Sequence, residues 1–314
     1  MKNRHHGFIV FFLFLFILLE GCSTVGVALY YKKAKLPEAQ IVRNVPYTKS
    51  ADADPVKNSL NLFLPKGKNW PTMVFVHGGM WIEGDKDLKV SGADVYGNIG
   101  RYFASQGIGV AVISYRLLPS VDWKKQLLDV ARATGWVYRH IHEYKGDPKA
   151  IFLAGHSSGA QLASRVAMDL SFMSSMGLPQ VMCGVIPISG AGYNFLNEET
   201  YQLGLEEGVY KELFNQETIS KPFRKKISPV FYARKSSPPF LILYAGREEK
   251  ELQQESLKFY NALVKAGTPS QIYSIPKERH KKMVLTLSHA NKMPAKLMMV
   301  FMRTLDCTSY RPDL

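Results

Sequence analysis

Gly155-His156-Ser157-Ser158-Gly159 lies near the middle of the chain, between an apolar run (150–154) and small residues in a helical pattern. A serine at a sharp turn from strand to helix is held in a strained conformation that exposes its oxygen. The flanking glycines let neighbouring backbone pass without a clash. We therefore take Ser157 as the candidate nucleophile. The same residues would also suit a helix start capped by serine.

The segments around this turn alternate between strand and helix patterns. Most of the strand candidates are continuous apolar runs, which are typical of strands buried on both faces. They are 59–64, 72–77, 109–115, 150–154, 184–188, 239–245 and 271–275. Helical patterns occupy 97–106, 123–144, 159–171, 253–266 and 281–289. This alternation predicts a mostly parallel central sheet with helices on both faces, and it places catalytic groups at the carboxyl ends of the strands.

A glycine-rich loop follows the second of these strands. It reads His77-Gly78-Gly79-Met80-Trp81. Backbone amides in such a loop can stabilise the negative charge that develops on a carbonyl oxygen during acyl transfer. We expect an oxyanion hole formed by the amides of Gly79, Met80 and Ser158, with His77 and Trp81 shaping the loop. A purely structural glycine turn is the alternative.

Several separated motifs together resemble the α/β-hydrolase superfamily, in its carboxylesterase branch that contains hormone-sensitive-lipase-like, kynurenine-formamidase-like and prenylcysteine-methylesterase-like enzymes. They are His77-Gly78-Gly79-Met80-Trp81, Ser114-Tyr115-Arg116-Leu117, Gly146-Asp147-Pro148, Gly155-His156-Ser157-Ser158-Gly159-Ala160 and Pro238-Pro239-Phe240-Leu241-Ile242-Leu243. The resemblance implies an α/β-hydrolase fold and a serine hydrolase that uses no cofactor and no metal. It leaves the substrate open, because such relatives cleave different esters and amides.

The remaining two catalytic groups are expected in the chain order serine, acid, histidine. His280 follows the last predicted strand and precedes a helix, which matches the histidine of the family. The resemblance implies that the acid lies a few residues after Gly246, at the end of the penultimate strand, where this chain has glutamates and no aspartate. Counting from Gly246 places Glu249 at the acid position and Glu248 one residue away. An acid from elsewhere in the chain stays open.

Composition limits the class of protein. The 314 residues are 46% hydrophobic and carry a formal net charge of +14. This hydrophobic share suffices for one large α/β core and excludes a disordered or fibrous chain. The lysines and arginines are dispersed, without zinc-finger spacing or aromatic-basic motifs. We therefore expect a solvated basic surface and no nucleic-acid binding.

Residues 1–22 have the pattern of a targeting segment. After a basic start, the uncharged run 8–19 is shorter than the roughly 20 residues that a membrane-spanning helix needs. The run ends in Leu19-Glu20-Gly21-Cys22, which resembles the lipobox of bacterial lipoproteins. The resemblance implies lipidation of Cys22 and anchoring on the periplasmic or cell-surface side of a membrane. Ser23 then favours the outer membrane, and an uncleaved N-terminal anchor is the alternative.

The rest of the chain divides into a linker and one domain. We expect a polar linker at 23–57 and a hydrolase domain at 58–314, with a small cap inserted at about 191–237, where charges and aromatics interrupt the alternation. Cys183 and Cys307 could form a disulfide in an oxidising compartment or remain free buried thiols.

These observations predict a membrane-tethered serine esterase that acts on a small-molecule ester. Ser157 would attack the acyl carbonyl, His280 would transfer the proton, and Glu249 would orient the histidine. Two alternatives stay open. One is an amidase or formamidase with the same triad, and the other is a lipoprotein that keeps the fold only for binding.

Overall fold

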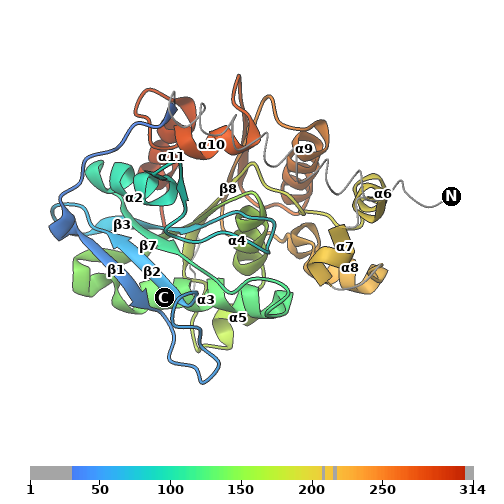
Figure 1. Ribbon diagram of the computed structural model, residues 1–314, viewed down its shortest axis with the longest axis horizontal. Coiled ribbons are helices and arrows are strands. Elements are labelled where there is room, and N and C mark those ends of the chain that lie inside the picture. The colour runs from blue at the N-terminus through green and yellow to red at the C-terminus, as the bar shows by residue number, and fades with distance from the viewer. Residues whose placement is uncertain (1–29, 207–208, 215–217, 308–314) are drawn as a thin grey trace.

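The computed structural model describes residues 30–206, 209–214 and 218–307 (Figure 1). Its centre is an eight-stranded sheet in the order β1-β2-β6-β3-β7-β8-β9-β10. All neighbours from β6 to β10 pair in parallel, whereas β2 pairs antiparallel with both β1 and β6. The prediction of a mostly parallel sheet is confirmed.

The strands of this sheet are β1 (Ile41–Pro46), β2 (Ser59–Phe63), β3 (Trp70–Val76), β6 (Gly109–Ile113), β7 (Gly146–His156), β8 (Met182–Ile188), β9 (Phe240–Ala245) and β10 (Ser270–Ile275). The short strands β4 (Lys89–Val90) and β5 (Ala93–Asp94) form a separate ribbon. The helices are α2 (Val95–Ser105), α3 (Trp123–His140), α4 (Ser158–Met168), α5 (Leu170–Ser174), α6 (Glu198–Glu206), α7 (Val209–Phe214), α8 (Lys221–Ile227), α9 (Lys250–Lys265), α10 (His280–Thr286) and α11 (Met293–Thr304), with 3-10 turns at Glu38–Gln40, Ile141–Tyr144 and Pro229–Tyr232.

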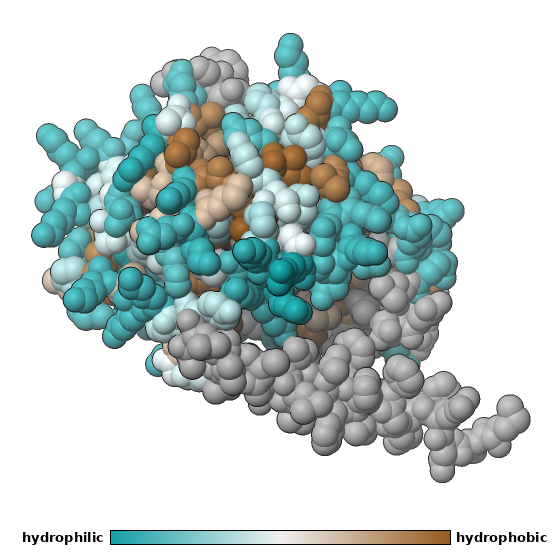
Figure 2. Space-filling view, turned by 90° about the horizontal axis from the view of Figure 1, so that it is seen from above, coloured by the Kyte–Doolittle hydropathy of each residue, from teal (hydrophilic) through white to brown (hydrophobic). Residues whose placement is uncertain are grey.

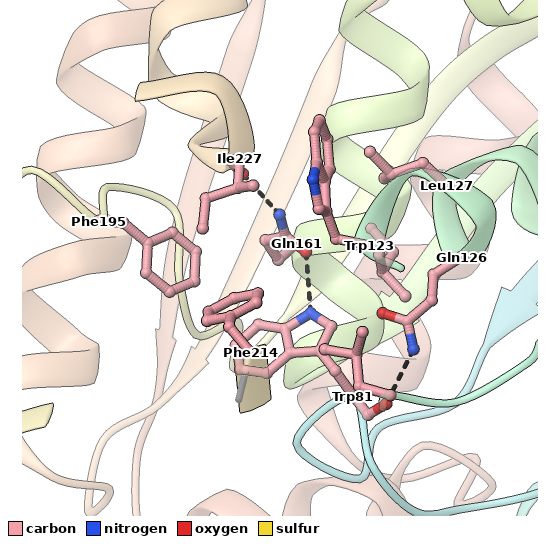
Figure 3. Close-up of a pocket in the computed structure, with 10 residues that line it drawn as sticks. Trp81, Trp123, Gln126, Leu127, Gln161, Phe195, Phe214 and Ile227 are labelled. Carbon is pink, nitrogen blue, oxygen red and sulfur yellow. Dashed lines mark hydrogen bonds between the residues drawn. The ribbon is translucent and has the colours of Figure 1, made fainter. Parts of the chain in front are cut away.

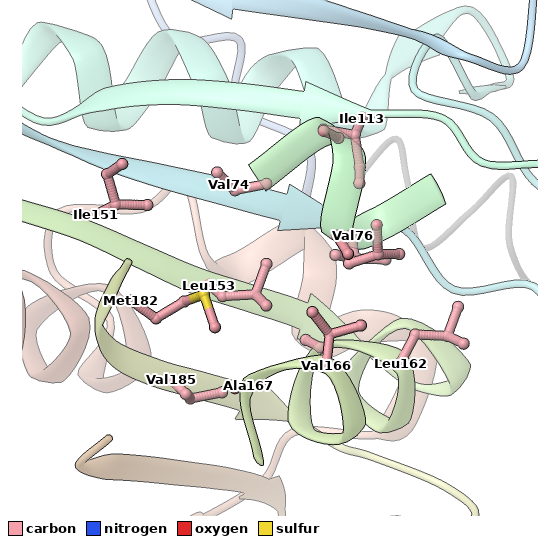
Figure 4. Close-up of a cluster of buried hydrophobic side chains, with 14 of the residues drawn as sticks. Val74, Val76, Ile113, Ile151, Leu153, Leu162, Val166, Ala167, Met182 and Val185 are labelled. Carbon is pink, nitrogen blue, oxygen red and sulfur yellow. The ribbon is translucent and has the colours of Figure 1, made fainter. Parts of the chain in front are cut away.

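Helices cover both faces of the sheet, as the alternation predicts (Figure 1). Side chains of α3, α4 and α9 pack on one face, where they meet Val74, Val76 and Leu153 of the central strands (Figure 4). Side chains of α2, α10 and α11 pack on the other face. Every residue of β2, β6 and β8 is buried, and β6 and β8 read as continuous apolar or small-residue runs.

Aspartates fix the starts of two of these helices. The Asp94 side chain accepts a hydrogen bond from the Gly97 amide at the start of α2. At the start of α3, the Asp122 side chain accepts one from the Lys125 amide. Each cap satisfies an amide that the first helical turn leaves unpaired.

Two segments differ from the sequence-based expectation. The expected linker, 23–57, contains β1, which pairs antiparallel with β2 at the edge of the sheet. Its mixed burial and its Pro46 are typical of an edge strand and hide it from a search for apolar runs. The other segment is α11, whose buried methionines complete the second face of the core and for which we predicted no helix.

The expected cap, 191–237, contains α6, α7 and α8 in its described part. These helices follow β8 and lie beside the carboxyl ends of the central strands (Figure 1). Phe195, Tyr201, Ile219 and Ile227 form a small hydrophobic cluster of their own, on which Trp81 and Trp123 pack. The cap is thus joined to the main domain near the glycine-rich loop.

The two cysteines of the described chain form a disulfide. Cys183 in β8 and Cys307, beyond α11, have their Cα atoms 5.0 Å apart. The bond fastens the end of the described chain to the centre of the sheet and excludes the alternative of two free thiols. Cys22 lies outside the described residues. Among the helices of the described chain, none combines the length and the apolar character needed to cross a bilayer.

Candidate active site

Ser157 lies at the turn between β7 and α4, with φ of +56° and ψ of −124°. Non-glycine residues rarely adopt this backbone conformation, and it persists only where the surroundings enforce it. The Ser157 amide donates to the Ile188 carbonyl at 3.0 Å, and its own carbonyl accepts from the Ala160 amide at 3.0 Å. These bonds hold the backbone so that the side chain stands at the carboxyl end of β7.

Three glycines make this turn sterically feasible. A Cβ at Gly155 would lie 2.3 Å from the Gly159 carbonyl oxygen, and a Cβ at Gly159 would lie 2.3 Å from the His77 carbonyl oxygen. At Gly78, a Cβ would come within 3.1 Å of the Ser157 Cβ. The turn and the glycine-rich loop therefore pack directly against each other, as the two motifs in the sequence require.

His280 lies at the start of α10, directly beyond the end of β10. Its Nε2 is 2.9 Å from the Ser157 Oγ, and its Nδ1 is 2.9 Å from Oε2 of Glu248. The Glu248 side chain is fully buried, while that of His280 is 19% exposed. The structure thus brings a hydroxyl, an imidazole and a buried carboxylate into one line of hydrogen bonds, which is the geometry of an activated serine.

The expectation that Glu249 faces His280 is wrong. Glu249 is exposed and occupies the N-cap position of α9, and its side chain makes no capping hydrogen bond. Glu248 points inward instead, because its Oε1 accepts from the Ala245 amide at 3.2 Å. The loop that carries it is fixed by amide hydrogen bonds from Gly246 and Arg247 to carbonyls of residues 275 and 278. The chain turns inward one residue earlier than the count from Gly246 suggests.

The glycine-rich loop curves past Ser157. Gly79, Met80 and Trp81 all have positive φ, of +126°, +49° and +65°. The Gly79 carbonyl accepts from the amides of residues 82 and 83, which closes the loop into a tight turn. Within the described chain, no protein acceptor is recorded for the amides of Gly79, Met80 or Ser158. An oxyanion hole requires amides that are not already hydrogen-bonded, and these three meet that condition within the described chain.

Buried groups hold the loop from behind. The His77 ring stacks on Tyr115 at 4.3 Å between centroids, and its Nδ1 donates to the Gly78 carbonyl at 2.7 Å. The Tyr115 hydroxyl donates to the His77 carbonyl at 3.2 Å. Burial lowers the pKa of His77 to about 4, so this ring is neutral at pH 7. Its contacts fit the expected role in shaping the loop.

His156 supports the candidate base. Its Nε2 donates to the His280 carbonyl at 3.1 Å, and the two rings lie 4.9 Å apart between centroids. Burial first, and then the neighbouring His280, lower the pKa of His156 to about 3. A neutral His156 therefore holds the backbone at the start of α10.

Two glutamines, which no motif in the sequence singles out, fix Trp81. The Trp81 indole Nε1 donates to Gln161 Oε1 at 3.0 Å, and Gln161 Nε2 donates to the Ile227 carbonyl of the cap at 2.7 Å (Figure 3). The Trp81 carbonyl accepts from Gln126 Nε2 at 2.8 Å. Gln161 lies one helical turn after Ser157, and this spacing is the one signal that could have found it.

A small apolar pocket surrounds these bonds. Figure 3 shows aromatic and aliphatic side chains from the glycine-rich loop, α3 and the cap converging on it. They include Trp81, Trp123, Phe195, Phe214 and Ile227. Its volume of about 20 Å³ is close to that of a single water. Within the described residues, no group of three or more His, Cys, Asp or Glu side chains is placed to hold a metal ion.

Comparisons with known proteins find esterases among the similar chains. The family model described as BD-FAE matches residues 60–263. The probable isoprenylcysteine alpha-carbonyl methylesterase ICME of Oryza sativa subsp. japonica is 27% identical over 87% of this chain and 64% of its own length. Esterase LipQ of Mycobacterium tuberculosis is 26% identical over 76% of this chain and 56% of its own length. The chain thus spans less than two thirds of these curated relatives.

Solved structures show the same fold. An inhibited esterase B from Lactobacillus rhamnosis has a TM-score of 0.72 at 22% identity and covers 96% of each chain. A truncated carbohydrate esterase from gut microbiota has a TM-score of 0.69 at 18% identity, over 87% of this chain and 96% of its own. With the parallel sheet and its flanking helices, these likenesses establish the α/β-hydrolase fold.

Proposed function

The chain belongs to the BD-FAE family, and from this premise we propose that it is a carboxylesterase in which Ser157 is the nucleophile. The observation that carries the proposal is the line of 2.9 Å contacts from Glu248 through His280 to Ser157. The esterases among its relatives support the reaction class, and they leave the substrate of this chain open.

In the proposed reaction, Ser157 Oγ attacks the acyl carbonyl carbon while His280 Nε2 accepts the hydroxyl proton. Buried Glu248 accepts the Nδ1–H bond and stabilises the imidazolium that forms. His280 then gives the proton to the departing alkoxide oxygen, which leaves an acyl-enzyme. A water molecule then attacks the acyl-enzyme while His280 accepts its proton. His280 returns this proton to Ser157 Oγ, and the acyl group leaves as a carboxylic acid.

The amides of Gly79, Met80 and Ser158 would stabilise the charge on the carbonyl oxygen in both steps. Removing one such donor typically costs about 10²–10³-fold in kcat. The loop is held in place because His77 stacks on Tyr115 and Trp81 donates a hydrogen bond to Gln161. Its amides therefore need little rearrangement to bind the oxyanion. This supports acyl transfer as the chemistry of the site.

A fluorophosphonate probe on the purified chain tests the nucleophile. We expect covalent labelling of the wild type and none of Ser157→Ala, together with a loss of p-nitrophenyl acetate hydrolysis of at least about 10⁴-fold. The variant removes one small polar atom, so its thermal unfolding should match the wild type. Comparable turnover by the folded alanine variant would exclude Ser157 as the nucleophile.

We further propose that Cys22 carries a lipid that tethers the enzyme to a membrane on its periplasmic or surface side. The pattern Leu19-Glu20-Gly21-Cys22 supports this, and so does the Cys183–Cys307 disulfide, since disulfides persist in oxidising compartments. Incorporation of labelled palmitate should be seen in the wild type and be lost in Cys22→Ala. A wild-type chain that carries no lipid and still begins at Met1 would contradict lipidation and favour the alternative of an uncleaved N-terminal anchor.

A further inference from the structure

A basic groove lies between the first described residues and the loop that joins α10 to α11. Lys32, Lys33 and Lys35 line it from one side, and His289 and Lys292 line it from the other. Tyr102 and Ser105 of α2 and Ser288, Ala290 and Asn291 of the loop complete the lining with Ala34. The groove has a volume of about 570 Å³, which is ample for a phosphate-bearing headgroup.

Buried hydrogen bonds fix the lysine-bearing segment in place. The Asn98 side chain, in α2, accepts from the Ala34 amide at 2.7 Å and donates to the Lys32 carbonyl at 2.9 Å. It also donates to Ser288 Oγ at 2.8 Å, and Asn98 itself is 1% exposed. One buried side chain thus joins both walls of the groove, so the lysines start from a fixed backbone.

The charges of the groove are incompletely balanced. None of the described lining residues is acidic, and no ion pair is recorded there for Lys32, Lys33 or Lys35. Among the described residues, Glu278 brings a carboxylate to the lining, where its Oε1 lies 3.6 Å from Lys292 Nζ, and it also pairs with Lys282. His289 also lines the groove, and its ring hydrogen-bonds the backbone of Tyr30. A site with these properties favours an anionic ligand that accepts hydrogen bonds.

Figure 2 looks down on the side of the molecule where α10 and α11 lie at the top of Figure 1. Hydrophilic residues predominate on this face and surround a broken band of hydrophobic ones across its upper middle. The face therefore suits contact with charged groups at a membrane surface better than insertion into hydrocarbon.

We propose that this groove binds the phosphate of an anionic phospholipid headgroup in the membrane that tethers the chain. The proposal rests on the tether proposed above. Lys32 follows Cys22 by ten residues, so a fully extended chain places it within about 36 Å of the anchor. Each lysine near an anionic surface strengthens binding to that surface. The groove wall at 288–292 directly follows α10, the helix that begins with His280. A headgroup bound in the groove would therefore fix the orientation of the candidate active site relative to the bilayer.

The test uses the purified full chain in a neutral detergent and short-chain, water-soluble lipids as probes. Titration calorimetry with dihexanoyl phosphatidylglycerol should give a dissociation constant at least about ten-fold lower than titration with dihexanoyl phosphatidylcholine. The triple variant Lys32→Gln, Lys33→Gln, Lys35→Gln should lose this preference. A matched triple variant, Lys66→Gln, Lys68→Gln, Lys149→Gln, removes the same charge from the loop before β3 and the start of β7, outside the groove lining, and should keep it.

Three results would overturn the proposal: equal affinity for the two lipids, an unchanged preference in the groove variant, or inorganic phosphate binding as tightly as phosphatidylglycerol. The last would indicate a site for a free phosphate compound. Hydrolysis of p-nitrophenyl acetate should stay within about two-fold of wild type in both triple variants, since none of these lysines touches the candidate active site. Headgroup binding, ester hydrolysis and lipidation are measured separately. Failure of the proposed esterase function can therefore be distinguished from failure of headgroup binding.

Discussion

At the scale of single residues, the direction of Glu248 follows from the way β9 ends. The strand stops at Ala245, and the amide of that residue donates to Glu248 Oε1, which turns the carboxylate back toward the sheet. The next residue, Glu249, already begins the exposed end of α9. A glutamate side chain has one methylene more than an aspartate. Because the Glu248 side chain folds back toward the Ala245 amide, its carboxylate still lies within hydrogen-bonding distance of His280.

Glu248→Gln should therefore lower kcat by about 10³–10⁴-fold, because an amide cannot stabilise the imidazolium form of His280. Glu249→Gln is the matched control, and because this exposed side chain makes no capping hydrogen bond in the described chain, the change should alter kcat less than two-fold. Steady-state kinetics on a short p-nitrophenyl ester measures both, with circular dichroism to check folding. A larger loss in Glu249→Gln than in Glu248→Gln would mean that the acid approaches His280 in another way.

At the scale of elements, α4 connects three parts of the candidate site. Its first residue follows Ser157, and Gln161, one turn on, bonds both Trp81 of the glycine-rich loop and the carbonyl of Ile227 in the cap. Gln161 is 3% exposed, so both bonds are made in a buried environment. Loss of its side-chain amide would leave an indole N–H and a carbonyl without partners.

Gln161→Met keeps the length of the side chain and removes both bonds. We expect about ten-fold lower kcat with a smaller change in KM, since the displaced loop carries the oxyanion amides rather than the main binding contacts. Gln180→Met is the control, because Gln180 donates to the Ala167 carbonyl, away from the glycine-rich loop. Equal losses of kcat in the two variants would mean that Gln161 stabilises the fold without positioning the glycine-rich loop.

The same elements show what a sequence can and cannot predict. Seven predicted runs correspond to seven strands. In the inner strands the apolar composition reflects burial on both faces, whereas the edge strand β10 is only partly buried and is recognised by its short run of β-forming residues. The edge strand β1 and the cap helices lack that signature, since solvent covers part of them. The motifs place Ser157 and His280 at strand ends, whereas the choice between Glu248 and Glu249 depends on a turn whose geometry no local pattern specifies.

At the scale of the whole molecule, buried titratable groups link folding to pH in opposite directions. Burial lowers the pKa of His77 to about 4 and that of His156 to about 3. Below about pH 6.5 these two histidines bind protons in the unfolded chain but not in the folded one, so a falling pH favours unfolding. Burial raises the pKa of Glu255, in α9, to about 7, although the amides of Gly192 and the next two residues lower it in part. This carboxyl group takes up a proton on folding between about pH 4.5 and 7.

The stability contributed by Glu255 is therefore fully present below about pH 4.5 and is lost as the pH rises through about 7. A rise in pKa from 4.5 to about 7 corresponds to roughly 3 kcal/mol. The amide introduced by Glu255→Gln cannot titrate, so the free energy of unfolding of this variant should rise relative to wild type by up to that amount between pH 4.5 and 8. Urea unfolding at both pH values measures the change, and the contributions of His77 and His156 cancel because both chains contain them. Glu251→Gln, an exposed position in the first turn of the same helix, should show no such pH-dependent difference. A Glu255→Gln curve parallel to wild type would mean that folding leaves the pKa of Glu255 near 4.5, with the loop amides offsetting the effect of burial.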